Sequence, residues 1–434
     1  MVNPICHYVE DSRRFTPVQV WEPNVNWKHT LLTAFLLAAN PVQAAASEGA
    51  KWSSADLATL DRWREAALLE GLPELSSAAL DTAREGGDPA LVDAEADILA
   101  LRLARMHLLG NAGSAERAGW NIPDSDADLP LEAMLERAVA DDTLDTFFAL
   151  MRPASKDYAA LLAAYDSEND SARRATIARN MERWRWMPRT LGEDYVLVNA
   201  ARFEAELVRG GEHVGSWRVI VGKTSTPTPV FQATIGGVVL NPWWEIPDSI
   251  VRESVGALVR NRPAVAAARG YVVQDGRYRQ KPGPGNALGQ MKLVMPNPYS
   301  VFMHDTPNKA LFDEEVRAFS HGCIRTGDAI GYAATLLESV LTREEIDAIL
   351  ASRQTKTVSI AHPMPVYITY FTAVGDGEGG VMLLDDIYNR DGRIRTLVRS
   401  GSSANEHLAA RMMHPLLMQG SATEALGDDR PAEC

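Results

Sequence analysis

Cysteine is scarce in this sequence of 434 residues. Only Cys6, Cys323 and Cys434 occur, so at most one internal disulfide can form and no disulfide framework supports the fold. Neither a Cys-x-x-Cys pair nor a zinc-finger spacing is present. The chain must therefore be stabilised by apolar packing, and its 46% of hydrophobic residues are enough for more than one core.

Positive charge is also in short supply. The 57 acidic residues outnumber the 43 basic ones and give a formal net charge of −14. Such a chain repels phosphate backbones and anionic lipid headgroups as a whole. We therefore expect no nucleic-acid partner.

The N-terminal part contains no apolar run that is long enough to span a bilayer. Leu31–Ala39 is too short for that, but it suits the hydrophobic region of a secretory signal, with Lys28 before it and the small residues of Val42–Ala44 at the cleavage positions. Polar residues precede Lys28, which suggests that the translation start is set too early; a short buried helix is the other interpretation. We expect residues 1–44 to be a signal region and the protein to be exported to the periplasm, whether or not it associates with the wall or membrane.

Apolar spacing predicts an α+β protein with a helical N-terminal domain over residues 45–185. Leu57, Leu60 and Trp63 begin a helical pattern that continues to about Asn180. After Leu191-Gly192 the pattern changes to short β-branched and aromatic runs, which predict a β-rich domain over residues 186–375. The expected strands are Asp194–Asn199, Ala205–Val208, Trp217–Val221, Val230–Leu240, Met291–Met295, Ser300–His304 and His362–Val374. Residues 376–434 are expected to form a C-terminal extension.

One stretch of the β-rich domain carries the residue types of a thiol enzyme. A strand ends at His304, and Ser320-His321-Gly322-Cys323-Ile324-Arg325 follows at the mouth of an expected helix. A neighbouring imidazolium or a helix amino end would lower the pKa of the thiol, and glycine permits a sharp turn before it. Backbone amides around Cys323 would stabilise a carbonyl oxygen that gains charge.

These residues resemble the motifs of the L,D-transpeptidases, whose catalytic domain is of the YkuD type. Met303–Pro307 and Ser320–Arg325 match the family's His and Ser-His-Gly-Cys segments in order and distance. Further matches identify the larger, multidomain branch and extend the resemblance over about residues 155–395; they are Asn180–Trp186, Thr228-Pro229, Asn241–Trp244 and Asn286–Gly289. The peptidoglycan-binding module that is usual in this branch is missing between Tyr165 and Asn180.

The resemblance implies a peptidoglycan L,D-transpeptidase that works without a cofactor or metal. Cys323 would be the nucleophile and His304 the general base, oriented by the backbone near Ser320 or His321, and Ser320, His321 and Gly322 would complete the catalytic segment. The substrate-binding residues would be Arg325, Asn286, Gly289, Trp243 and Trp244. A capping segment would cover the cleft over about residues 247–284. The implied partners are donor and acceptor peptide stems, carbapenem inhibitors and other cell-wall enzymes.

Other interpretations stay open. A hydrolase of the same fold would use water as the acceptor and act as an L,D-carboxypeptidase or release a lipoprotein, and a wall-binding scaffold would have a dead site. Cys323 and His304 could instead be core residues, Arg325 could form a surface salt bridge, and His304, His321 and Cys323 could in principle bind zinc. The tryptophans Trp184, Trp186, Trp243 and Trp244 could pack or could form a platform for sugars. Gly222-Lys223-Thr224 is not a phosphate loop, because that motif needs glycine where Trp217 stands.

Overall fold

The computed structural model describes residues 51–395. The expected signal region, Cys6, Cys434 and the end of the C-terminal extension lie outside the described residues, so export stays a prediction. Within residues 51–395, no helix combines the length and the apolar character that crossing a membrane requires.

The first part of the described chain is helical, as the spacing predicts. Helix α1 begins with a capping box in which Ser53 and Asp56 bond each other's backbone N–H groups, and α3 begins at the N-cap Asp88. Gly71 is the C-cap of the short helical turn Ala67–Glu70, and Gly110 is the C-cap of α3. The helices are α1 (Ser54–Ala66), α2 (Ala78–Gly86), α3 (Pro89–Leu109), α4 (Leu131–Ala140), α5 (Leu144–Met151), α6 (Lys156–Ser167) and α7 (Ser171–Trp184). The predicted domain limit at residue 185 stays a prediction.

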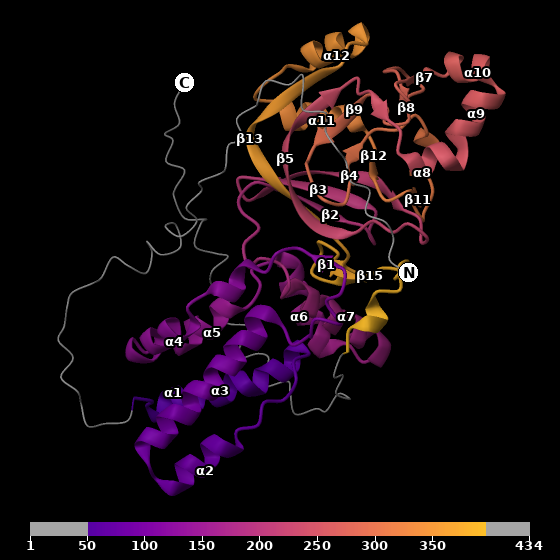
Figure 1. Ribbon diagram of the computed structural model, residues 1–434. Coiled ribbons are helices and arrows are strands. Elements are labelled where there is room, and N and C mark those ends of the chain that lie inside the picture. The colour runs from indigo at the N-terminus through magenta and orange to yellow at the C-terminus, as the bar shows by residue number, and fades with distance from the viewer. Residues whose placement is uncertain (1–50, 396–434) are drawn as a thin grey trace, which may run out of the picture. The chain divides into compact units, whose positions relative to one another are not determined.

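A ten-stranded sheet forms the second part (Figure 1). Its order is β1-β5-β13-β2-β3-β4-β12-β10-β9, and β5 also pairs with β9, so the sheet closes on itself. Strand β11 pairs with β4. The strands are β1 (Trp120–Asn121), β2 (Tyr195–Asn199), β3 (Glu204–Arg209), β4 (Glu212–Gly222), β5 (Val230–Leu240), β9 (Met291–Val294), β10 (Met303–His304), β11 (Ala318–Ser320), β12 (Ile324–Thr326) and β13 (Lys356–Thr369).

Alternation along the strands places one face of this sheet in the core. Met291, Leu293, Met303 and Ile324 are buried together in it. Helix α11 (Ala329–Leu337) contributes Tyr332 and its apolar neighbours to the same core, and α12 (Arg343–Ser352) follows it. The residues that directly follow or precede these core residues in each strand therefore point to the opposite face of the sheet.

The capping segment contains both helices and strands. Helices α8 (Asp248–Ile250), α9 (Gly256–Asn261) and α10 (Pro263–Ala268), with a π-helical turn at Val251–Val255, are followed by two strands. These strands, β7 (Tyr271–Gln274) and β8 (Arg277–Gln280), form a separate three-stranded sheet with β6 (Trp244–Glu245). Figure 1 shows the helices and strands of the segment grouped beside β9 and β12.

A buried ionic cluster joins the helices that precede α7 to the C-terminal end of α7. Glu70 accepts hydrogen bonds from Arg152 at 2.8 Å and from the Tyr158 hydroxyl at 2.7 Å, and the His107 ring lies 3.3 Å away. Arg185 donates to the Glu70 carbonyl oxygen at 2.9 Å. Burial alone would raise the pKa of Glu70, but Arg152, His107 and Arg185 outweigh it and hold this pKa well below its usual range. The pKa of His107 is lowered, mainly by its own burial.

We predict that Glu70→Gln destabilises the protein by about 3–5 kcal/mol, because it leaves buried arginine charges without their partner. Both pKa values are lowered, so the unfolded chain binds more protons than the folded one and stability decreases as the pH is lowered. The His107 contribution should decline below about pH 6.5, and the Glu70 contribution below about pH 4.3.

Urea unfolding followed from about pH 2 to about pH 8 measures both effects. The variant should lose the Glu70 contribution throughout and show a weaker acid dependence below about pH 4.3. Glu65→Gln, on the exposed side of α1, is the matched control and should leave stability unchanged. Equal stability of wild type and Glu70→Gln would contradict a net stabilising role for the cluster.

Candidate active site

Cys323 ends a tight turn between β11 and β12. The Ser320 hydroxyl accepts a hydrogen bond from the Gly322 N–H at 3.0 Å and donates one to the Cys323 carbonyl oxygen at 2.5 Å. Gly322 adopts a φ of +115°, a conformation that side chains other than hydrogen rarely allow. The expected helix after Cys323 is wrong: Ile324–Thr326 continue as β12, and α11 begins only at Ala329.

The segment from Gly222 to Thr228, at the end of β4, supports the Cys323 turn through hydrogen bonds. The fully buried Thr228 hydroxyl accepts from the Gly222 N–H at 2.9 Å and donates to the Gly322 carbonyl oxygen at 2.9 Å. The Tyr388 hydroxyl donates to the Gly222 carbonyl oxygen at 2.6 Å. The sequence offers Thr228 only as part of a motif match and gives no signal for Tyr388, because both act through contacts that are distant in the chain.

His304 is buried on β10, and its orientation differs from the sequence expectation. Its Nδ1 lies 2.5 Å from the Asp305 carbonyl oxygen, so the orienting group is this carbonyl and not the backbone near Ser320 or His321. A carbonyl only accepts, so Nδ1 carries the proton of the neutral ring and Nε2 is left with its lone pair. That tautomer is the one that a general base needs.

Lys292, His304 and Arg325 form one row across three neighbouring strands. His304 is the register partner of Lys292 on β9 and of Arg325 on β12. Register partners point to the same face of a sheet, with Cβ atoms about 5 Å apart. The base is therefore flanked by a cation on each side, away from the face that carries Leu293, Met303 and Ile324.

Neither cation has a salt-bridge partner within 4 Å among residues 51–395. The Lys292 Nζ instead stands 3.6 Å from the centroid of the Phe302 ring. Arg325 was predicted to bind an anionic stem, and its place beside His304 leaves the guanidinium available for that purpose. Lys292 was missed; the available signal was a single lysine inside the apolar run Met291–Met295.

The electrostatics of the site favour two neutral reacting groups. Burial lowers the pKa of His304 to about 4, and Arg325 and Lys292 add to this, while the Asp305 contacts oppose it. Burial raises the pKa of the half-buried Cys323 thiol, against the lowering effects of the Phe302 N–H, Lys292 and Arg325. Burial thus opposes the expected lowering of the thiol pKa, and no helix begins directly after Cys323. The low pKa of His304 leaves its imidazole unprotonated at neutral pH.

The thiol and the imidazole share no hydrogen bond in the described part of the chain. Cys323 Sγ donates weakly to the Ser300 carbonyl oxygen at 3.8 Å. Contacts between catalytic groups are often loose before substrate binds. This arrangement suits proton transfer during attack, not a thiolate that forms in advance.

His321 turns toward the capping segment. Its Nε2 lies 2.9 Å from Glu253 Oε2 on the π-helical turn and 3.5 Å from Lys223 Nζ, and the side chain is exposed. His321 therefore joins the Cys323 turn to the capping segment.

Two of the predicted substrate-binding residues have structural contacts instead. The buried Asn286 amide donates to the Pro242, Gln280 and Lys281 carbonyl oxygens and accepts from the Leu288 N–H, so it joins the two ends of the capping segment. At Gly289 a Cβ would lie 2.3 Å from Asp305, so glycine is needed for Asp305 to approach. The geometry does not support a substrate role for either residue.

The four tryptophans fall into two groups. Trp184 and Trp186 are core residues; Trp184 stacks on Phe371 with a centroid distance of 4.5 Å. Trp243 and Trp244 are half-buried at the start of the cap, and the Arg279 guanidinium lies 4.6 Å from the Trp243 ring centroid. Only the second pair stands where a bound stem could meet it.

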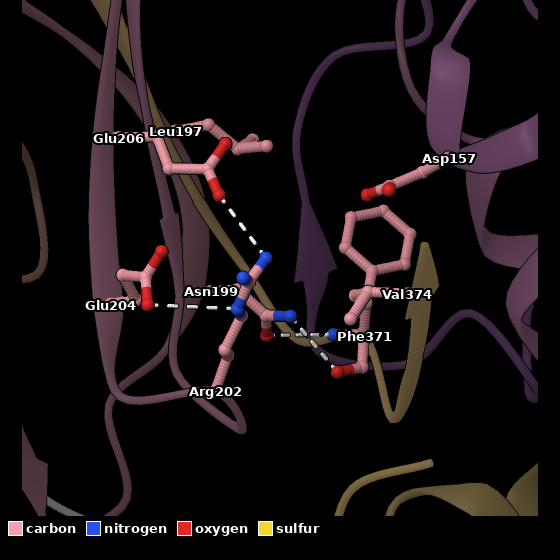
Figure 2. Close-up of a pocket in the computed structure, with 8 residues that line it drawn as sticks. All are labelled: Asp157, Leu197, Asn199, Arg202, Glu204, Glu206, Phe371 and Val374. Atoms are coloured by element: carbon pink, nitrogen blue, oxygen red, sulfur yellow. Dashed lines mark hydrogen bonds and ion pairs between the residues drawn. The ribbon is translucent and has the colours of Figure 1, made fainter. Parts of the chain in front are cut away.

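Other candidate sites in the described chain are weaker. No group of three or more His, Cys, Asp or Glu side chains in residues 51–395 is placed to hold a metal ion. Figure 2 shows a cavity beside the Arg202 ion pairs with Glu204 and Glu206. Its volume of about 10 Å³ holds no more than one water molecule. A cavity of about 250 Å³ next to Glu116 and Glu182 is lined by none of the predicted site residues.

Comparison with known proteins identifies the domain around Cys323. Residues 193–367 match the YkuD family model, which describes the L,D-transpeptidase catalytic domain. The matched residues include His304, the Cys323 turn and the whole capping segment.

The relatives match over limited shares of their length. A Haemophilus influenzae protein provisionally named an L,D-transpeptidase is 30% identical over 239 residues, which are 50% of this chain and 48% of that protein. The chain thus spans about half the length of this curated relative. Among solved structures, L,D-transpeptidases of Mycobacterium smegmatis and Enterococcus faecium are each 13% identical, with TM-scores of 0.23. They cover 41% and 42% of this chain, and 58% and 52% of their own.

We predict different losses for the two histidines of the YkuD domain. His304→Ala should slow acylation of Cys323 by a carbapenem roughly 10²- to 10⁴-fold at neutral pH, the usual contribution of a positioned base. His321→Ala should cost much less, because His321 contacts the cap. Wild type should keep its rate well below pH 6 and lose it as pH falls through about 4, where His304 protonates.

The measurement is the rate of adduct formation by mass spectrometry from about pH 3 to about pH 10. His304→Ala should gain rate only at alkaline pH, as the thiolate forms, and Cys323→Ala should form no adduct. An alkaline shift in His321→Ala with a wild-type profile in His304→Ala would reverse the two roles.

Proposed function

We propose that this protein is a peptidoglycan L,D-transpeptidase that cross-links peptide stems through a Cys323 thioester. The observation that carries the proposal is the placement of Cys323 beside the row Lys292–His304–Arg325 within a YkuD domain. A thiol, an unprotonated imidazole and two cations without ion-pair partners in the described chain suit attack on an anionic peptide. The same proposal places the enzyme in the periplasm, where its polymer lies.

In the first half-reaction, Cys323 Sγ attacks the carbonyl carbon between diaminopimelate at position three and D-alanine at position four of a donor stem. His304 Nε2 takes the thiol proton as the S–C bond forms. The carbonyl oxygen gains negative charge near the Cys323 N–H, which has no acceptor among the described residues. The C–N bond then breaks, and His304 returns the proton to the leaving amine of D-alanine.

In the second half-reaction, an amine of another stem attacks the thioester carbonyl. His304 takes the amine proton, the new C–N bond forms, and the Cys323 thiol leaves and is protonated again. Arg325 is available for a stem carboxylate, and Trp243 and Trp244 offer apolar surface at the edge of the cap. The capping segment would exclude water, which otherwise competes as the acceptor.

Incubation of purified protein with a disaccharide-tetrapeptide tests the proposal. We expect a cross-linked dimer that lacks one D-alanine, detected by mass spectrometry, and no product from Cys323→Ala. A trimmed tripeptide without dimer would replace transpeptidation by L,D-carboxypeptidase activity. Unchanged substrate would indicate a scaffold with a dead site.

We further predict that Glu253→Gln lowers the ratio of dimer to trimmed product, because it weakens the contact that holds the cap to His321. Both side chains are largely exposed, and such pairs contribute about 0–1 kcal/mol, so the change should stay within about fivefold. Glu212→Gln, at an exposed hairpin remote from the cap, is the control. An unchanged ratio in Glu253→Gln would argue against the contact as a water barrier.

A further inference from the structure

Lys292 is a cation beside the reacting groups that the proposed mechanism does not use. It lies on β9 in direct register with His304, and its Nζ rests on the Phe302 ring at 3.6 Å. The carbonyl oxygen of Phe302 accepts from the Ile324 N–H at 2.9 Å, so the same residue that carries the ammonium group also joins the strand after Cys323. Lys292 is thereby held at the nucleophile turn.

We propose that Lys292 is a positioning residue, whose charge acts with that of Arg325 to keep His304 unprotonated and to stabilise negative charge on the Cys323 sulfur. The inference rests on the strand register, which places His304 between the cations Lys292 and Arg325 on one face of the sheet. The effect of Lys292 on catalysis rests on the proposed function. Its effect on the protonation of His304 and Cys323 is a property of the free enzyme and needs no substrate.

The anionic groups near this row have other partners. Glu245 on β6 faces Lys292, but Arg279 on β8 bonds it at 2.6 Å. Asp305, next to His304, forms an ion pair with Lys309 and accepts from the Gln290 N–H at 2.8 Å. Neither Lys292 nor Arg325 therefore forms an ion pair with these groups, although Glu245 interacts with Lys292 at longer range.

The electrostatics agree with this placement. Lys292 and Arg325 both lower the pKa of His304, and both lower the pKa of Cys323 against the larger effect of burial. Cys323 and Glu245 in turn raise the pKa of Lys292, although burial lowers it overall. A weakly basic imidazole returns its proton readily to the leaving amine, while the cations offset the cost of forming a sulfur anion away from water.

The test compares wild type with Lys292→Met, Lys292→Arg and the control Lys356→Met at an exposed position of β13. Alkylation of the full chain by iodoacetamide, measured across pH 6–11 on the peptide that contains Cys323, reports the thiolate. Histidine NMR across pH 3–8, with His304→Ala to assign the signal, reports the imidazole. Neither measurement needs a peptidoglycan substrate.

Without the charge, Cys323 should ionise at higher pH, and alkylation at neutral pH should fall about tenfold. His304 should also titrate at higher pH than in wild type, so both changes have the same direction. Lys292→Arg should retain the wild-type behaviour, and Lys356→Met should match wild type. If Lys292→Met does not fold, Lys292→Gln is measured by the same criteria.

Unchanged titrations of both groups in the uncharged variant would overturn the inference. The inference would fail in that case even if turnover of a tetrapeptide fell, because the lysine would then act on a substrate carboxylate. If the titrations shift in Lys292→Met but the wild-type protein leaves peptide stems unchanged, the inference is supported and the proposed function is contradicted. The two failures are therefore distinguishable.

Discussion

The hydrogen bond between His304 Nδ1 and the Asp305 carbonyl oxygen determines what the site can do. It selects the neutral tautomer with a free Nε2, and it holds the ring on the outer face of β10. Asp305 is fixed in turn, because its N–H donates to the Met291 carbonyl oxygen at 2.9 Å and its carboxylate accepts from the Gln290 N–H. The base is therefore oriented by the backbone that follows the cap.

The cap and the base share this support. Asn286 joins both ends of the capping segment, and Gly289 leaves room for Asp305 directly after it. On the other side of the site, His321 meets Glu253 of the cap while Ser320 holds the turn that presents Cys323. Asn286 and Gly289, which the motif suggests as substrate contacts, thus hold the capping segment and Asp305 in place.

Local features of the fold were predictable from local patterns. Strands such as Val230–Leu240 and the helix starts at Ser54 and Asp88 follow from side-chain periodicity and capping chemistry. The closure of the sheet through β5 and β9, and the pairing of β1 with β5, depend on register between distant segments. For the same reason, no local pattern in the sequence reveals strand β1. The site shows a similar division: the motif alone selects His304 and Cys323 as candidates, but their charge states depend on burial and on neighbours across strands. A helix was expected after Cys323 because helical spacing follows, whereas Ile324 is required in the core and Arg325 on the opposite face, which only a strand provides.

Lys292 illustrates why the remaining features of the site could be recognised only from the structure. In sequence it is one lysine in an apolar run, and its neighbours Met291 and Leu293 are fully buried. Alternation alone turns it away from the core, but only the register shows that it shares a row with His304. Placing an ammonium group on an aromatic ring costs less than leaving it unpaired in an apolar site, and this lets the fold keep a positive charge next to its nucleophile. Desolvation makes both reacting groups neutral, and the same desolvation strengthens the effect of each cation on the charge that develops during attack.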